Sequence, residues 1–600
     1  MDNFLVNTIK STEIFSSLTE EECLSISHFF ETIQLKCGTI LFNQNDSSDC
    51  LYILVDGNLS AILKMTDGTS KIVGTIKKGE TVGELGVLSQ QPRTLTVKAT
   101  IGSTLLKLPA NSLAQICQIH PAVLYKIIGP IVSRSQRTIQ LLAQNNKTKH
   151  IVVIPTNDSV SLSSLKAKIK KNISNFVNIT LLVDSEFEIG VEEKKISNVL
   201  ECIEKIEKEN STILYLIESY DSALLKVCIE KADDIYFVSD SNSNPNYSEF
   251  VRQLLSNRKQ LNDVRDILVL QHNDSKILPG STESWLIYHR FSLYHHVRTH
   301  NDNDYQRLLR FMLGKTTGLV LGGGGMKGWA HLGVIKALEE ANIPIDMTGG
   351  TSIGSIVAGC FSLSETYEAT LEKFRFIMNA DPKLFKLKNF TWPSISILSS
   401  KNNTEALIKA FDNLHIEDLW LPYFCLSCNL TLKNESIHTQ GLLWEKIRAS
   451  VAVPGIVPPM VLDGQLHVDG GLVNNLPVDV MRNFLGTSSK IVAVRVSSQR
   501  EENHSYNFPP VLTFKQALLV KLGWKHHEYK FPSFLDTFIN ALLVGSYQKE
   551  LQCSMQADLL ISPNLSSYKM LKISKNQEDN LIDLGYHSTV DLLSKSKSKF

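Results

Sequence analysis

The stretch "LVLGGGGMKGWAHLG", residues 319–333, decides the fold of the second half of the chain. Its glycines between Gly323 and Gly328 spell G-x-G-x-x-G. The residues before this loop have the apolar character of a buried strand, and those after it have the spacing of a helix. The sequence therefore predicts an α/β unit from about residue 316, with a loop whose backbone N–H groups approach an anion. That anion is either a dinucleotide pyrophosphate or a different anion.

The dinucleotide interpretation needs an acidic residue about 20 positions further on, after the next strand. Asp346 stands close to that place, so the loop alone does not reject a nucleotide cofactor. A phosphate loop of the Walker type is rejected at "GKTT", residues 314–317, because Leu309 occupies the position of its first glycine.

A second glycine pattern favours ester chemistry. In "IPIDMTGGTSIGSIVAG" the residues Gly350 to Gly354 spell G-x-S-x-G, between a strand-like and a helix-like run. This is the pattern of a nucleophile elbow, with Ser352 as the nucleophile on a sharp strand-to-helix turn. The glycine loop then acquires the role of oxyanion hole. Its amide donors are expected from Gly323, Gly324, Gly325 and Met326, with the Ile353 amide as a further candidate.

Lys327 follows the predicted oxyanion loop and either fixes it or faces solvent. The base for Ser352 is expected in "DGQLHVDGGLVNNLPVDVM", residues 463–481, where Asp469 precedes two glycines in a turn after a strand. A Ser-His-Asp triad stays open, with His467 or His331 as the histidine.

These three motifs, in this order and spacing, resemble the patatin-type lipid acyl hydrolases, a family that uses a Ser–Asp dyad without histidine. Further similarity to the neuropathy target esterase branch lies in "IEDLWLPYF" (416–424), "IRASVAVPGIVPPM" (447–460) and "DGGLVNNLPVDV" (469–480). The resemblance covers most of the chain. Animal members of that branch carry a membrane-spanning N-terminus and several cyclic-nucleotide-like domains, whereas this sequence has no such span and one such domain.

The resemblance implies a serine hydrolase that releases fatty acid from phospholipid or lysophospholipid, with Ser352 and Asp469 as its catalytic pair. It implies no required cofactor and no metal, and peripheral contact with a membrane. The alternative is a nucleotide-sensing scaffold whose hydrolase fold is inactive.

Residues 11–125 contain short alternating apolar runs split by glycine turns, which predict a small antiparallel barrel or jelly roll. Within it, "TVGELGVLSQQPRTLTV", residues 81–97, resembles the phosphate-binding cassette of cyclic-nucleotide-binding domains. We expect cyclic AMP or cyclic GMP as a regulatory ligand of this barrel.

The residues of this cassette are Gly83, Glu84, Leu85, Arg93 and Thr94. Arg93 is suited to pair with a cyclic phosphate, and Glu84 to accept from a ribose hydroxyl. Gly83 lets the backbone approach, and the Thr94 hydroxyl weakly favours cyclic GMP. In the competing interpretation, Glu84 and Arg93 form a structural ion pair in a barrel that binds no ligand.

The remaining sequence predicts the order of domains. Five apolar runs separated by charged helical stretches predict a parallel α/β domain in the middle of the chain. The expected segments are a barrel over 11–125, a connecting helix over 126–148, the parallel α/β domain over 149–290, a helical linker over 291–315, a patatin-like α/β hydrolase domain over 316–500 and a helical extension packed on it over 501–600.

Composition limits the partners, metal sites and cellular location that we expect for the chain. Lysine plus arginine balance aspartate plus glutamate at 61 each, so nothing in the overall charge favours nucleic acid. Ten cysteines lie scattered, and the one C-x-x-C, Cys425 to Cys428, lacks a second ligand pair and predicts buried thiols rather than zinc. No apolar run has the length of a bilayer span, and the first residues lack a secretion core. We expect a cytoplasmic protein with peripheral membrane contact.

Overall fold

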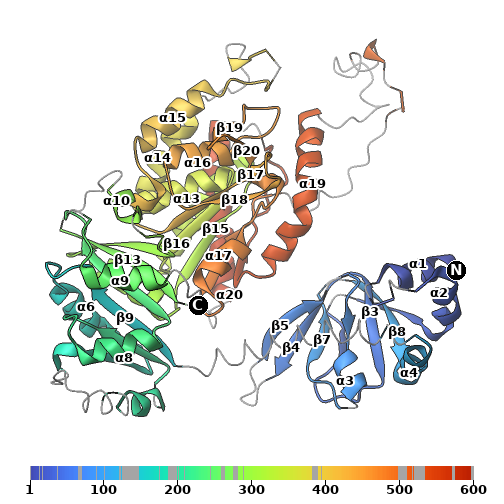
Figure 1. The fold of residues 1–600 in the computed structure, drawn as a ribbon. Coiled ribbons are helices and arrows are strands. Elements are labelled where there is room, and N and C mark those ends of the chain that lie inside the picture. Colours follow the sequence, from blue (N-terminus) through green and yellow to red (C-terminus); the bar gives the residue numbers. More distant parts are fainter. Residues whose placement is uncertain are drawn as a thin grey trace. The chain divides into compact units, whose positions relative to one another are not determined.

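The chain divides into two compact units, residues 1–147 and 148–600, which are described separately (Figure 1). The computed structural model describes every residue except 1, 13, 16–17, 37, 65–69, 77, 90, 101, 121–122, 124–147, 175, 187–198, 200–201, 209, 244, 259–263, 274–280, 288, 381–388, 393–394, 498–507, 509, 512, 516–517, 519–533, 571–573 and 596–600. The connecting helix expected over 126–148 therefore lies outside the described residues, apart from Thr148.

The first unit is the predicted antiparallel jelly roll. One sheet has the order β1-β8-β3-β6 and the other β2-β7-β4-β5, and neighbouring strands run antiparallel. The strands are β1 (Glu31–Leu35), β2 (Ile40–Phe42), β3 (Cys50–Asp56), β4 (Leu59–Lys64), β5 (Ser70–Ile76), β6 (Thr81–Val82), β7 (Thr96–Ala99) and β8 (Ser103–Pro109). The helices are α1 (Asp2–Ser11), α2 (Glu20–Ile26), α3 (Glu84–Ser89) and α4 (Ala110–Ile119). The alternation seen in the sequence buries Leu51, Ile53, Leu106 and Leu108 under α1, α2 and α4.

The middle of the chain forms a parallel six-stranded sheet in the order β10-β11-β9-β12-β13-β14, as predicted. Its strands are β9 (Lys149–Pro155), β10 (Ile179–Val183), β11 (Thr212–Leu216), β12 (Asp234–Asp240), β13 (Arg265–His272) and β14 (Leu293–Arg298). Its helices include α6 (Ser163–Ile173), α8 (Ala223–Lys231), α9 (Glu249–Arg258), α10 (Glu283–Leu286) and α11 (Asp302–Met312).

The helical linker expected over 291–315 is wrong in its first half, because β14 is the sixth strand of this sheet. Its sequence, "LYHHVR", places two histidines where a buried strand normally carries apolar residues. His295 and His296 are nevertheless buried, and His296 Nδ1 lies 2.8 Å from His272 Nε2 on β13. The two buried histidines of β14 thus interrupt the continuous apolar run by which the other five strands are recognised.

The third part is an eight-stranded mixed sheet in the order β19-β20-β17-β16-β15-β21-β22, with β18 paired to β17. The strands are β15 (Thr317–Leu321), β16 (Met347–Thr351), β17 (Tyr423–Asn429), β18 (Asn434–His438), β19 (Met460–Leu462), β20 (Gln465–Asp469), β21 (Lys490–Val494) and β22 (Leu559–Ile561). The helices are α12 (Trp329–Glu340), α13 (Ile353–Ser364), α14 (Tyr367–Asn379), α15 (Lys401–Phe411), α16 (Leu443–Ser450), α17 (Val478–Leu485), α19 (Phe534–Ser554) and α20 (Lys575–Lys595).

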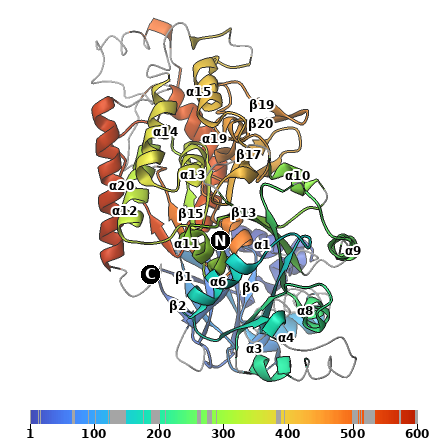
Figure 2. The same ribbon diagram turned by 90° about the vertical axis from the view of Figure 1, so that its left-hand side faces the viewer.

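The C-terminal hundred residues are more than the helical extension that the sequence predicts. Strand β22 pairs in parallel with β21 and widens the sheet. Helix α20 lies beside α12, as Figure 2 shows, and two glycines permit that close approach. A Cβ on Gly585 would lie 2.0 Å from the Ala330 carbonyl oxygen, and one on Gly333 would lie 1.8 Å from that of Ile582.

The two faces of β15 explain why residues 148–600 form one unit. Leu319 and Leu321 point into a core with α12, α13 and α20. Val320 points to the opposite face, into a core that it shares with Ile151 and Val153 of the middle sheet. Among the described helices, none is both long and apolar enough to cross a bilayer.

Candidate active site

Ser352 stands on the sharp turn between β16 and α13. Its backbone has φ 53° and ψ −127°, a left-handed conformation that is strained for a residue with a side chain. The flanking glycines are required sterically. A Cβ on Gly350 would lie 2.6 Å from the Gly354 carbonyl carbon, and one on Gly354 would lie 2.1 Å from the Leu321 oxygen. The G-x-S-x-G pattern thus forms the predicted strand–turn–helix elbow.

Asp469, at the end of β20, meets Ser352 across the sheet. Ser352 Oγ donates to Asp469 Oδ2 at 2.8 Å, and the Gly471 amide donates to Asp469 Oδ1 at 2.8 Å. Burial raises the pKa of Asp469 to about 6, although both of these hydrogen bonds act to lower it. The pair therefore combines a hydroxyl with a carboxylate that is more basic than an ordinary aspartate.

Neither candidate histidine contacts this pair. His467 Nδ1 lies 2.8 Å from Ser427 Oγ on the neighbouring strand β17. His331 Nε2 lies 2.9 Å from the Gly322 carbonyl oxygen, and burial lowers the pKa of His331 to about 4. The described residues thus bring serine and aspartate together without an intervening imidazole.

The glycine loop lies directly against Ser352. A Cβ on Gly323 would lie 3.2 Å from the Ser352 Cβ. Two of the four predicted oxyanion amides already donate elsewhere, Gly323 to the Asn475 carbonyl at 3.1 Å and Met326 to the Met570 carbonyl at 2.7 Å. These two bonds fix the ends of the loop, while Gly324 and Gly325 lie between them. Lys327 is buried, so of its two predicted roles the structure agrees with fixing the loop.

The geometry also decides against the dinucleotide interpretation. Asp346, its candidate ribose ligand, is buried and accepts from Arg310 Nη2 at 2.6 Å and from the Thr317 amide at 2.9 Å. Both carboxylate oxygens are thereby committed to holding the start of β15 and helix α11. The loop faces Ser352 instead.

Three supporting residues of the site were not predicted. Ser450, at the end of α16, accepts from the Ser352 amide at 3.0 Å. Asn475 Nδ2 donates to the Gly323 carbonyl at 3.3 Å and to Glu550 Oε2 on α19 at 2.9 Å. Ser450 and Asn475 both fall in the stretches that carry the family resemblance, which was the available signal. Glu550 had none, because its partner lies 75 residues away along the chain.

The predicted nucleotide cassette lies in the first unit. Gly83 has φ 84°, and Arg93 is buried beside it. The Arg93 guanidinium donates to the Gly83 carbonyl at 2.8 Å and to the Cys50 carbonyl at 2.7 Å, and it lies 3.7 Å from Asp49. Glu84, at the start of α3, is also buried, and Thr94 is exposed. The backbone of Leu85 belongs to α3, and its side chain is outside the described set.

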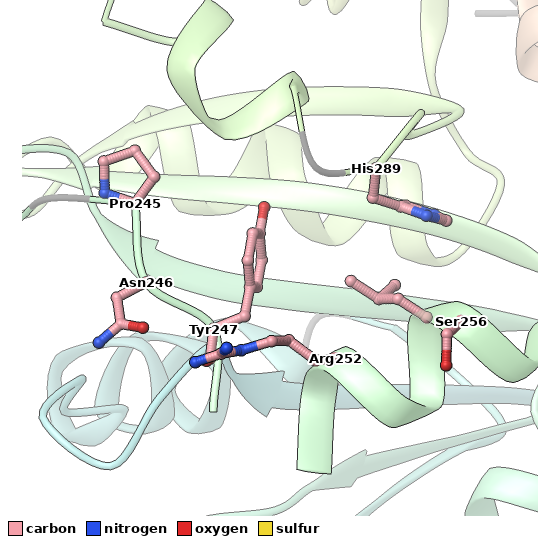
Figure 3. A pocket seen from close by; sticks show the side chains of 7 residues that line it. Pro245, Asn246, Tyr247, Arg252, Ser256 and His289 are labelled. Atoms are coloured by element: carbon pink, nitrogen blue, oxygen red, sulfur yellow. The ribbon is translucent and has the colours of Figure 1, made fainter. Parts of the chain in front are cut away.

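Other features of the described chain do not form a competing site. Cys425 and Cys428 are buried, and burial raises the pKa of both thiols. Within the described ranges no group of three or more His, Cys, Asp or Glu side chains is placed to hold a metal ion. A surface pocket lies beside α9, one of the helices that pack on the middle sheet (Figure 3). The Ser256 hydroxyl in this pocket donates a hydrogen bond to the Gln253 carbonyl and points away from His289.

A nucleophile elbow on a largely parallel sheet, an aspartate at the end of an antiparallel strand and a glycine loop together resemble the catalytic domain of the patatin-type hydrolases. The family model described as "Patatin-like phospholipase" matches residues 319–482. Two further models match, "Cyclic nucleotide-binding domain" at residues 32–120 and "Neuropathy Target Esterase family P-loop like domain" at residues 147–317. The chain joins these three domains in one polypeptide.

Curated relatives confirm the predicted resemblance to the neuropathy target esterase branch. "Neuropathy target esterase sws" of Drosophila melanogaster is 29% identical over 92% of this chain and 42% of its own length. "Lysophospholipase NTE1" of Mycosarcoma maydis is 29% identical over 78% of this chain and 29% of its own. "Patatin-like phospholipase domain-containing protein 7" of Mus musculus is 26% identical over 94% and 45%. The chain thus spans less than half the length of these relatives.

Proposed function

We propose that this protein is a serine hydrolase that releases fatty acid from lysophospholipid or phospholipid. The observation that carries the proposal is the 2.8 Å hydrogen bond between Ser352 Oγ and Asp469 Oδ2 on a strained elbow beside a glycine loop. The substrate class is supported by the printed names of the relatives, two of which contain the words phospholipase or lysophospholipase.

The proposed reaction proceeds in two halves. Asp469 accepts the Ser352 proton while Ser352 Oγ attacks the ester carbonyl, and the proton passes to the leaving glycerol oxygen. Water then gives its proton to Asp469 and attacks the acyl group on Ser352, releasing the fatty acid and restoring both residues. The developing oxyanion accepts from Gly324, Gly325 and the Ile353 amide at the N-terminus of α13.

This proposal is tested by fatty-acid release from lysophosphatidylcholine. We expect Ser352→Ala and Asp469→Asn each to lower kcat by ~10³-fold or more, because each removes half of one catalytic unit. His467→Gln is the matched control for a triad, and it should keep a rate within ~10-fold of wild type because His467 bonds only within the strand region. Wild type without hydrolysis on any phospholipid would favour the inactive scaffold, and loss of activity in His467→Gln alone would favour a triad.

We propose a second function for the first unit, residues 1–147. This unit binds a cyclic nucleotide, and the bound nucleotide modulates hydrolysis. The family match supports a cyclic nucleotide-binding fold. Arg93 is a buried cation whose guanidinium now donates to the carbonyls of Gly83 and Cys50, and a cyclic phosphate would replace these acceptors with a charged one.

Cyclic AMP and cyclic GMP are each expected to raise the melting temperature of the wild type. Arg93→Ala should weaken binding by ~10-fold or more, because it removes a charge-assisted pair. Since Arg93 also holds two barrel carbonyls, Glu84→Gln, which keeps the shape of the side chain, is the second variant. Equal affinity in wild type and both variants would contradict the proposal. A fatty-acid release rate that does not change with bound nucleotide would reject modulation while leaving binding intact.

A further inference from the structure

The segment of chain that ends immediately before α15 pairs with itself, through an antiparallel bridge between Phe390 and Leu398. The Thr391 amide donates to the Ile397 carbonyl at 3.0 Å, and the Ser399 amide donates to the Asn389 carbonyl at 2.8 Å. We name its described residues, 389–392 and 395–399, the Trp392 hairpin. Figures 1 and 2 both place α15, which follows it, at the same end of the catalytic part as β19 and β20, the strand that ends in Asp469.

The hairpin carries apolar side chains on two sides, one exposed to solvent and one buried in the protein. Trp392 is 85% exposed, Ile395 69% and Phe390 45%, whereas Leu398 on its inner side is fully buried. Large apolar side chains gathered on one short exposed turn are unusual for a protein surface and mark a site of interaction. The hairpin thus presents an anchor that its own fold leaves uncovered.

The inner side of the hairpin leads to the reacting residues. Its Ile397 and Leu398 amides donate to the Gly455 and Ile456 carbonyls, each at 2.9 Å. In the same loop, the Ala452 carbonyl accepts a hydrogen bond from the Asp469 amide at 2.9 Å. The exposed turn and the catalytic aspartate are therefore joined through one short loop.

An apolar cluster follows the same course. Leu398, Ile456 and Ile539 form its buried centre, with Leu543 and Met570 packed against it. The Met570 carbonyl accepts from the glycine loop at Met326, and Leu543 would lie 3.3 Å from a Cβ on Gly471. Apolar surface thus runs from beneath the hairpin to both the glycine loop and the aspartate turn.

We propose that the Trp392 hairpin docks on the surface of a phospholipid bilayer and brings the active site to its substrate there. The inference rests on the proposed lipid hydrolase function. A lipid surface is favoured because tryptophan suits the headgroup level of a bilayer and because the apolar cluster beneath the hairpin continues to the glycine loop and the aspartate turn of the active site.

Co-sedimentation with vesicles of phosphatidylcholine and phosphatidylserine tests the docking directly. The double variant Trp392→Ser, Ile395→Ser should partition to vesicles at least ~10-fold more weakly than wild type, because it removes two exposed apolar side chains that the bilayer would bury. Val177→Ser is the matched control, since Val177 is 76% exposed in the middle part, and it should bind like wild type. Equal partitioning of wild type and double variant would overturn the proposal.

Hydrolysis on two substrates separates docking from catalysis. The double variant should hydrolyse a soluble short-chain ester at the wild-type rate and lose at least ~10-fold of its rate on vesicle-embedded phospholipid. Equal loss on both substrates would make the hairpin part of the active-site fold and overturn the proposal. Vesicle binding by a wild type that hydrolyses neither substrate would uphold docking and reject the hydrolase. A wild-type dimer that the double variant converts to monomer, with vesicle binding unchanged, would make the hairpin a subunit contact instead.

Discussion

Asp469 is a buried carboxyl whose hydrogen bonds compensate its charge only in part. Folding raises its pKa from an ordinary 3.8 to about 6. Between these values the folded chain binds more protons than the unfolded one, so stability falls as the pH rises from 4 to 6. Above pH 6 the ionised carboxyl costs the folded state about 3 kcal/mol, which is the difference between the two pKa values converted to free energy. A base poised near neutral pH is obtained at that cost.

Two measurements follow from this pKa. The rate constant kcat/KM for ester hydrolysis should rise with pH through about 6, as the base loses its proton. Asp469→Asn keeps an acceptor for Gly471 and a partner for Ser352, but it has no charge to bury. Its melting temperature should exceed that of wild type at pH 8, and the excess should shrink towards pH 4.

The control for this prediction is Asp591→Asn, at an exposed position of α20. It should change the melting temperature little at either pH. An excess for Asp469→Asn that is the same at pH 8 and pH 4 would show that burial of the charge is not its cause.

The sequence predicts Ser352, Asp469 and the glycine loop because each stands in a local pattern with a steric reason. It does not predict that the Gly323 and Met326 amides donate to the Asn475 and Met570 carbonyls, since those partners come from distant segments. Local motifs therefore identify the reacting groups, and long-range hydrogen bonds decide which backbone amides of the loop stay available.

At the scale of elements, the close contact between α12 and α20 lies directly beyond the glycine loop. Helix α12 begins at Trp329, directly after that loop, and α20 packs along it with the two backbones nearly touching at Gly333 and Gly585. Such an approach is available only where no Cβ stands between the helices.

Gly585→Ala should therefore lower the free energy of unfolding by ~1–3 kcal/mol, because its Cβ would overlap the Ala330 carbonyl. Gly545→Ala on α19 is the matched control. No atom lies within 4 Å of its added Cβ, so it should stabilise the chain by up to ~1 kcal/mol through higher helix propensity. Denaturant unfolding measures both, and equal effects of the two substitutions would contradict this account of the helix contact.

Strands β14 and β22 escaped prediction for different reasons. Strand β14 buries two histidines where apolar residues are expected, and β22 has three residues in a stretch between two long helices. The five predicted strands of the middle sheet have continuous apolar runs. Elements that join a sheet at its edge depend on tertiary pairing more than on their own sequence.

At the scale of the whole molecule, residues 148–600 are held together by a shared core and an ionic network. Arg298 Nη2 on β14 lies 2.5 Å from Glu365 Oε2, and Arg307 Nη1 on α11 lies 2.8 Å from Glu365 Oε1. Asp304, fully buried, accepts from Arg298 Nε at 2.6 Å. Glu365 is the C-cap residue of α13, the helix that begins after Ser352. The middle part is thus joined to the nucleophile helix.

The sequence predicts the order and class of the three domains, because alternation marks the barrel and the glycine motifs separate the catalytic α/β part from the middle one. It does not predict that the middle and catalytic parts share one core, since Val320 and Ile151 belong to strands that each look complete on their own. Shared cores between sheets arise from the faces of helices and strands that meet only after folding.

Covalent labelling by a fluorophosphonate tests the central claim, that Asp469 activates Ser352 as a nucleophile. The Ser352 oxygen would bond to phosphorus as fluoride leaves and the proton passes to Asp469. We expect one adduct per chain, mapped by mass spectrometry to Ser352, none in Ser352→Ala, and labelling slower by ~10³-fold in Asp469→Asn. An unlabelled wild type, or Ser352→Ala labelled as fast as wild type, would contradict the account.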